Sequence, residues 1–212
     1  MMKPIVVTGT DTGIGKTVFS AALTQALSAT YWKPVQSGLD EETDTEVVTG
    51  LAGCNALPEK YRLQIPASPH FSAEEEGVLI DTSNLSLPQV DGPLVVEGAG
   101  GLMVPLTREI LLIDLFRKWQ APIVLCARTG LGTINHTLLS IEALRARRCN
   151  LLGIVFIGDE VADSERTIVE YAGAKKLGRF PVLRDITPET IRTAFAENFQ
   201  LEDFGVQHEE NA

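Results

Sequence analysis

One stretch near the N-terminus, VVTGTDTGIGKTVF at residues 6–19, constrains the fold more than any other part of the chain. Two β-branched residues lead into a loop rich in glycine and threonine, and Gly15-Lys16-Thr17 opens a run with apolar residues at helical spacing. This order predicts a strand, a phosphate-binding loop and a helix. In such a loop the backbone N–H groups and the helix N-terminus surround an anion, Lys16 reaches the terminal phosphates, and the Thr17 hydroxyl reaches a magnesium ion.

The loop is one residue longer than the common phosphate-loop (P-loop) pattern. Five residues separate Gly9 from Gly15, whereas G-x-x-x-x-G-K-[ST] has four. The additional residue disfavours GTPases and motor ATPases, and it is typical of P-loop proteins that handle metabolites. The alternative is a glycine-rich turn with a solvated Lys16, but the strand before the loop and the helix after it favour nucleotide binding.

Composition limits the function classes. With 212 residues and 44% hydrophobic content the chain can bury one substantial core. A formal charge of −10 argues against nucleic acid or an anionic membrane as a general partner, so an anionic ligand must be held by local cations. No apolar run reaches the ~18 residues of a membrane helix, and a signal-peptide layout is lacking, so we expect a cytoplasmic protein. Cys54, Cys126 and Cys149 lack metal-ligand spacing, and we expect them to be reduced and structural.

Strands and helices alternate along the chain. Apolar spacing predicts helices over residues 16–28, 111–119, 134–148, 163–176 and 188–199, and strands over residues 31–35, 93–97, 122–127, 151–157 and 177–182. This alternation predicts an α/β fold with a mostly parallel sheet and helices on both faces, the P-loop nucleoside triphosphate hydrolase fold. We expect residues 1–212 to form a single domain with a frayed tail at about 207–212.

Charged residues follow two of the predicted strands. Lys33 is expected at the carboxyl end of strand 31–35, where open α/β sheets bind ligands, although a solvent-facing lysine would show the same spacing. Glu97 is expected to end the next strand, before Gly98-Ala99-Gly100-Gly101, where a P-loop enzyme places a carboxylate toward magnesium. The acidic segment at residues 40–46 should mostly supply helix N-terminal charges, and one of its carboxylates could coordinate magnesium instead.

A second loop, RTGLGT at residues 128–133, precedes the predicted helix at 134–148. Thr133 can cap this helix, and the free N–H groups there form a second candidate anion site, suited to a carboxylate. A plain capped turn would look similar. Asp163 can likewise cap the helix that we expect to reach Lys176. His70, in a proline-framed loop before a short helix, has no metal partner in the sequence and is interpreted as a packing residue.

Taken together and in order, the segments VTGTDTGIGKT, WKPVQSG, PASPH, VVEGAGG with Pro105-Leu106, and GLGTINHTLLS resemble the motif series of the dethiobiotin synthetase family. The resemblance covers residues 6–183. It implies an enzyme of biotin biosynthesis that converts 7,8-diaminononanoate, CO2 and ATP into dethiobiotin, ADP and phosphate, with Mg²⁺. It also implies a homodimer whose active site lies at the subunit interface.

The resemblance further implies roles for particular residues. Lys16 and Lys33 would be catalytic, because cations are needed around a transferring phosphoryl group and a carbamate. Magnesium would be bound by Thr17, Asp44 and Glu97, with Asp44 preferred over Asp40. The diamine or its carbamate would be held by Thr12 and Ser37, and its carboxylate by Leu131, Gly132, Thr133 and Asn135 of the other subunit. The nucleotide-binding set would be Gly13, Ile14, Gly15, Lys16, Thr17, Val18, Asp44, Glu97, Gly98, Ala99, Gly100, Gly158, Asp159, Pro181, Val182 and Leu183.

Two residues depart from the family pattern. Many members carry Glu where this chain has Gly13, and many carry an Asn that hydrogen-bonds adenine where it has Gly158. Loss of such a contact is worth about 1 kcal/mol, so we expect relaxed base selectivity. Two other functions stay open: a related P-loop amidoligase, although 212 residues leave no room for a glutaminase domain, and a partitioning-type ATPase switch, although no lysine precedes Lys16 in the loop.

Overall fold

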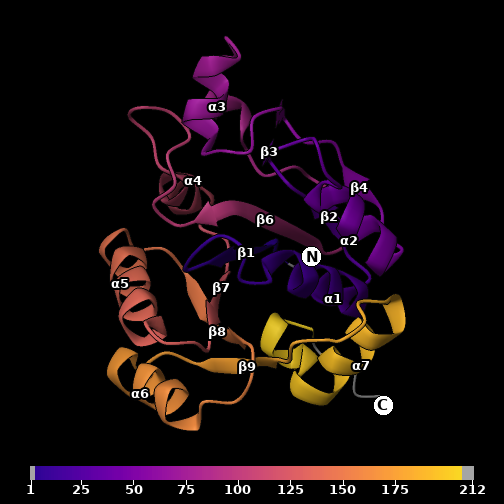
Figure 1. Cartoon of the computed structure of the whole chain (residues 1–212), viewed down its shortest axis with the longest axis vertical. Helices are drawn as coiled ribbons and strands as arrows, with labels where there is room; N and C mark the ends of the chain where they lie inside the picture. Colours follow the sequence, from indigo (N-terminus) through magenta and orange to yellow (C-terminus); the bar gives the residue numbers. More distant parts are fainter. Residues whose placement is uncertain (1–2, 207–212) are drawn as a thin grey trace.

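The computed structural model describes residues 3–206 of the chain. Its centre is a seven-stranded sheet in the order β4-β2-β6-β1-β7-β8-β9, in which every neighbouring pair is parallel (Figure 1). The strands of this sheet are β1 (Ile5–Gly9), β2 (Thr30–Trp32), β4 (Ala56–Leu57), β6 (Leu94–Gly101), β7 (Ile123–Arg128), β8 (Leu151–Ile157) and β9 (Lys176–Phe180). A separate two-stranded parallel sheet pairs β3 (Val35–Ser37) with β5 (Tyr61–Leu63).

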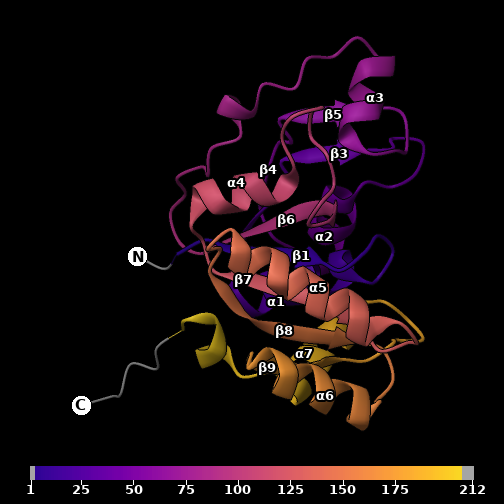
Figure 2. The same cartoon turned by 90° about the vertical axis from the view of Figure 1, so that its left-hand side faces the viewer.

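Helices cover both faces of the large sheet (Figures 1 and 2). One face carries α1 (Lys16–Leu27), α2 (Asp44–Ala52) and α7 (Pro188–Asn198). The opposite face carries α4 (Leu112–Trp119), α5 (Thr133–Ala146) and α6 (Ala162–Ala172). The helix α3 (Pro69–Glu75) lies against the small sheet, and two short 3-10 turns occupy Thr82–Asn84 and Leu201–Phe204.

The central strands are buried on both sides. Successive side chains of β1 alternate between two hydrophobic clusters: Ile5 and Val7 join the cluster under α1 and α7, whereas Val6 joins the cluster under α4, α5 and α6. Each of these three side chains is at most 2% exposed. A parallel sheet covered on both faces needs such uninterrupted apolar runs, and this pattern confirms the predicted α/β fold.

Three predicted elements have different bounds in the structure. The strand expected at 31–35 is two strands, β2 and β3, because Pro34 has no N–H for a ladder and the chain leaves the large sheet there. The strand expected at 93–97 continues through the glycines to Gly101, so Glu97 lies within β6 and does not end it. The helix expected to reach Lys176 ends at Ala172, because Gly173 adopts a left-handed conformation with φ of 52°.

Both predicted N-caps are wrong. Gly132 is the N-cap residue of α5, and Thr133 is the first helical residue, with its hydroxyl donating to the Arg128 carbonyl oxygen. Val161 precedes α6, and Asp163 pairs with Arg166 one turn further along the helix.

The three cysteines are free thiols, as predicted. Within residues 3–206, no helix is long and apolar enough to span a membrane. The single-domain assignment stays a prediction, and the tail expected to fray, at 207–212, lies outside the described residues.

Candidate active site

The loop after β1 and the start of α1 place two polar side chains of the site. Gly15 adopts φ of 93° as the N-cap of α1, a backbone conformation that favours glycine. The two residues that follow it, Lys16 and Thr17, therefore lie in the first turn of the helix. Lys16 is 6% exposed, and its Nζ donates to the Asp11 carbonyl oxygen at 2.6 Å.

Thr17, Asp44 and Glu97 bring three oxygen ligands together. The Thr17 hydroxyl donates to Asp44 Oδ1 at 2.8 Å and to Glu97 Oε1 at 3.1 Å. Asp44 lies in the first turn of α2, where the helix dipole and the N-cap Thr43 favour a carboxylate. Asp40, the other candidate in the acidic segment, instead accepts from Gln64 Nε2 at the surface. The geometry thus favours Asp44 as the carboxylate that faces Thr17.

Lys33 follows β2 and lies between the two carboxylates. Its Nζ is 2.5 Å from Asp44 Oδ2 and 3.3 Å from Glu97 Oε1, and it also donates to the Gly98 carbonyl oxygen at 3.1 Å. The Lys33 side chain is 4% exposed and that of Glu97 is 1% exposed, so this is a buried ion pair. The alternative of a solvent-facing lysine is therefore excluded.

Burial and charge oppose each other in this cluster. Burial alone would lower the pKa of Lys33, but the carboxylates of Glu97 and Asp44 outweigh burial and raise it. Burial likewise opposes the lowered pKa of Asp44, which results from the charge and hydrogen bond of Lys33. The pKa of Lys16 is lowered, mainly by burial and further by the positive charge of Lys33, while Glu97 opposes the shift. The cluster thus holds Lys33 protonated and Asp44 ionised.

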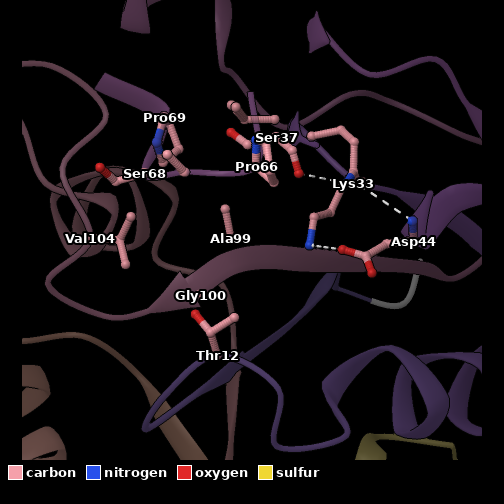
Figure 3. A pocket seen from close by; sticks show the side chains of 13 residues that line it. Thr12, Lys33, Ser37, Asp44, Pro66, Ser68, Pro69, Ala99, Gly100 and Val104 are labelled. Atoms are coloured by element: carbon pink, nitrogen blue, oxygen red, sulfur yellow. Dashed lines mark hydrogen bonds and ion pairs between the residues drawn. The ribbon is translucent and has the colours of Figure 1, made fainter. Parts of the chain in front are cut away.

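A cavity of about 420 Å³ opens beside this cluster. In Figure 3, Lys33 reaches toward Asp44 at one end, Val104 lies at the other, and Thr12 faces Ser68 and Pro69 across the space. The predicted residues that line it are Thr12, Lys33, Ser37, Asp44, Ala99 and Gly100, joined by Val35, Gln36, Pro66, Ala67, Ser68, Pro69 and Val104. The Ser37 hydroxyl is buried and has no hydrogen-bond partner among the described residues. This cavity can therefore take a polar substrate next to Lys33.

A second cavity, of about 330 Å³, is lined in part by the phosphate loop. Seven residues of the predicted nucleotide-binding set line it: Gly13, Ile14, Gly15, Val18, Pro181, Val182 and Leu183. Gly158 and Asp159 do not line it. A Cβ at Gly158 would lie 2.3 Å from Thr129 Oγ1, and its φ of 135° would strain any other residue. The mostly apolar lining suits a flat heterocyclic base.

The predicted carboxylate site at the start of α5 stands apart from both cavities. Leu131, Gly132 and Asn135 are exposed, whereas Thr133 is buried. The Thr133 hydroxyl and N–H are already bonded to the carbonyl oxygens of Arg128 and Gly130. Only the exposed residues of this helix start are accessible to a ligand, and within one chain no described residue of the 420 Å³ cavity comes from it.

Sequence reasoning missed several contacts. The buried Tyr31 hydroxyl donates to Glu97 Oε2 at 3.0 Å, and burial followed by the Glu97 charge raises the pKa of Tyr31 well above its usual value. Gln36 Oε1 accepts from the Asp44 N–H at 3.4 Å. Arg128 pairs with Asp11 across the phosphate loop at 2.6 Å. Two of these pairs, Tyr31 with Glu97 and Arg128 with Asp11, join residues far apart in sequence. The only available signal was that each residue lies in or beside a motif segment.

Known structures share this fold. A ParA family ATPase from Chlorobium tepidum TLS superposes with a TM-score of 0.52 at 9% identity over 91% of this chain and 96% of that one. Cyanthece apo McdA gives a TM-score of 0.53 at 10% identity over 92% of this chain and 91% of that one. At such identities the likeness shows the fold alone. The family model described as an AAA domain matches residues 3–190.

Sequence relatives are much closer. An ATP-dependent dethiobiotin synthetase BioD from Rhodopseudomonas palustris (strain HaA2) is 63% identical over 96% of this chain and 97% of its own length. Proteins with the same name from Brucella anthropi and Agrobacterium fabrum are 58% and 59% identical, over 97% and 94% of this chain and 98% and 95% of their own lengths. With a phosphate loop, two lysines and two carboxylates arranged on the matching fold, the chain belongs to the ATP-dependent dethiobiotin synthetase family.

Proposed function

We propose that this chain closes the ureido ring of dethiobiotin from 7,8-diaminononanoate, CO2 and ATP. One amine adds to CO2 and loses a proton, which gives a carbamate. A carbamate oxygen then takes the γ-phosphoryl group and ADP leaves. The second amine attacks the activated carbonyl carbon, the C–O bond to phosphate breaks, and the ring and inorganic phosphate are released.

One observation carries this proposal: Lys33 lies between the two carboxylates that face Thr17 and a cavity large enough for a small diamine. Phosphoryl transfer to a carbamate brings two anions together, and a protonated amine between them lowers the barrier most where water is excluded. The raised pKa of Lys33 keeps this charge in place at neutral pH. Lys16, in the first turn of α1 directly after the loop, is proposed to hold the β- and γ-phosphates.

Thr17, Asp44 and Glu97 are the proposed magnesium residues. Their chemistry fits, because Mg²⁺ prefers oxygen ligands and is usually held by one or two carboxylates together with substrate phosphates. In residues 3–206 there is no group of three or more His, Cys, Asp and Glu side chains that could hold a metal by itself, so nucleotide oxygens would complete the shell. When bound, the ion would supply positive charge to the phosphates.

The second substrate would lie in the 420 Å³ cavity, with Thr12 and the unpartnered Ser37 hydroxyl toward its nitrogens or carbamate. Its carboxylate is proposed to reach the start of α5 of a second subunit, because no residue from that helix lines the cavity within one chain. A homodimer is supported by exposed apolar side chains near α5, namely Leu131, Leu139 and Met103.

The direct test is to incubate the protein with diaminononanoate, bicarbonate, magnesium and ATP, and to measure dethiobiotin by mass spectrometry. We expect dethiobiotin and phosphate in equal amounts, with phosphate release strictly dependent on the diamine. A Lys16→Met variant serves as the control for contaminating activity. Phosphate release that ignores the diamine would instead favour a partitioning-type switch, and amide formation on another acid would favour an amidoligase.

A further inference from the structure

Asp11, in the phosphate loop, contacts two cations, Lys16 at the start of α1 and Arg128 at the end of β7. Its backbone carbonyl oxygen accepts from Lys16 Nζ at 2.6 Å. Its carboxylate Oδ2 accepts from the Arg128 guanidinium at 2.6 Å, and its Oδ1 accepts from the Thr12 N–H at 2.8 Å. One residue thus contacts two positive groups.

Arg128 is placed for this contact by the sheet. It ends β7, which is the neighbour of β1 in the large sheet (Figure 1). The register of these two strands places Gly9 opposite Cys126. The carboxyl end of β7 is therefore next to the loop that follows β1. Arg128 also lines the 330 Å³ cavity together with Gly13 and Gly15, and it is the only charged residue among the described residues that do so.

The ion pair between Asp11 and Arg128 can be replaced at little cost in stability. Its two side chains are 45% and 49% exposed, and exposed ion pairs contribute little to stability. A triphosphate offers a denser negative charge than one carboxylate, and a guanidinium binds phosphate oxygens with two parallel hydrogen bonds. A chain with a net charge of −10 needs such local cations to attract a nucleotide.

We infer that Arg128 is a nucleotide-binding residue that contacts the triphosphate, and that Asp11 holds its guanidinium until the nucleotide arrives. The inference rests on the ATP dependence of the proposed function, but it does not depend on which acceptor receives the phosphoryl group. When nucleotide binds, Arg128 thus exchanges the Asp11 carboxylate for the phosphates of the nucleotide.

Calorimetric titration with Mg-ATP and with Mg-ADP tests the role of Arg128 directly. Arg128→Gln should weaken binding of both nucleotides by about 10- to 100-fold, the loss expected for a charge-assisted contact. Arg128→Lys should be intermediate, because an ammonium keeps the charge but not the paired hydrogen bonds. Asp11→Asn should bind as tightly as wild type or more tightly, since it frees Arg128.

Arg166→Gln is the matched control. Arg166 also forms an exposed ion pair, with Asp163 on α6, and it lines neither cavity. It should leave nucleotide affinity unchanged. The inference is overturned if Arg128→Gln binds both nucleotides like wild type, or if it raises only the KM for the diamine, which would assign Arg128 to the substrate carboxylate. Weaker binding in Asp11→Asn would overturn the holding role of Asp11. Arg128-dependent binding without any dethiobiotin would refute the proposed reaction and leave this inference standing.

Discussion

Lys33 pairs with the same carboxylates that we propose as magnesium ligands, so it has both a structural and a catalytic role. Removing it leaves Glu97 buried without its cation, and breaking a buried pair typically costs about 3–5 kcal/mol. Because Asp44 is 29% exposed, its share of this cost is screened by water. A Lys33→Ala variant is therefore expected to lose stability as well as turnover, which a purely catalytic lysine would not do.

We predict that Lys33→Ala reduces turnover by at least about 100-fold, because one preorganised positive group at the transferring phosphoryl is lost. We also predict a lower melting temperature, part of which Mg²⁺ restores by neutralising Asp44 and Glu97. Differential scanning calorimetry with and without Mg²⁺ measures the second effect. Lys175→Ala, which removes a half-exposed lysine paired with Asp203, is the control and should change neither quantity much. Near-normal turnover in Lys33→Ala would refute the assigned role.

Tyr31 acts on the site only through Glu97. In Tyr31→Phe the buried Oε2 of Glu97 loses its donor, which should cost about 1.5–3 kcal/mol in the free energy of unfolding. If the hydrogen bond also aims the carboxylate, the Mg²⁺ concentration for half-maximal activity should rise several-fold while KM for the diamine stays constant. Urea unfolding and a magnesium titration measure the two effects. Tyr61→Phe, which breaks an exposed hydrogen bond with Asp81, is the control. An unchanged magnesium requirement would limit Tyr31 to a structural role.

At the scale of elements, local pattern was sufficient for most of the sheet and its helices. Continuous apolar runs predicted the buried strands, and the phosphate loop predicted the start of α1. The errors lie where a local rule was overruled by contacts made elsewhere. After Pro34 the chain starts a second sheet, and β6 continues through its glycines because it stays paired with β1 as far as Gly101. A Cβ at Gly98 would lie 3.1 Å from Leu112 and Phe116, so the close packing of α4 favours glycine there.

The candidate site was only partly predictable for the same reason. Lys33, Asp44 and Glu97 were each flagged by a neighbouring motif, and the structure brings them together. Tyr31 directly precedes the WKPVQSG segment, but its contact with Glu97 spans 66 positions of sequence. The Arg128–Asp11 pair spans 117 positions. Pairings of this kind depend on strand order, which periodicity within one segment does not determine.

Gly158, which directly follows β8, is the basis for a prediction on which nucleotide bases the protein accepts. Gly158 packs against Thr129 and offers no side chain to a base, and the nearby cavity is mostly apolar. We therefore predict that CTP or GTP supports measurable dethiobiotin formation, with kcat/KM within about 10-fold of the ATP value, since one polar contact is worth about 1 kcal/mol. Comparing kcat/KM for the three nucleotides checks this. Strict dependence on ATP would contradict it.

At the scale of the whole molecule, the phosphate loop lines both cavities, with Thr12 in one and Gly13, Ile14 and Gly15 in the other, but the predicted carboxylate site lines neither. Within one chain Leu131, Gly132 and Asn135 at the start of α5 are exposed, and Leu139 is an exposed apolar side chain further along the helix. A C2 dimer brings the same patch of both subunits together and could seat each α5 beside the cavity of its partner. The proposed dimer thus makes a definite claim about which chain supplies which residue.

Mixing a variant altered at Lys33 with a variant altered at Asn135 tests that claim. Lys33→Ala should remove turnover at its own cavity, and Asn135→Ala should raise KM for the diamine by weakening the site at α5. If each active site combines Lys33 of one subunit with Asn135 of the other, a mixed dimer contains one intact site and one doubly altered site. Unfolding and refolding the two variants together should then restore wild-type KM at about a quarter of the wild-type site concentration, since half of the dimers are mixed. If both residues serve one subunit's own site, every site in the mixture carries one substitution and no wild-type KM appears.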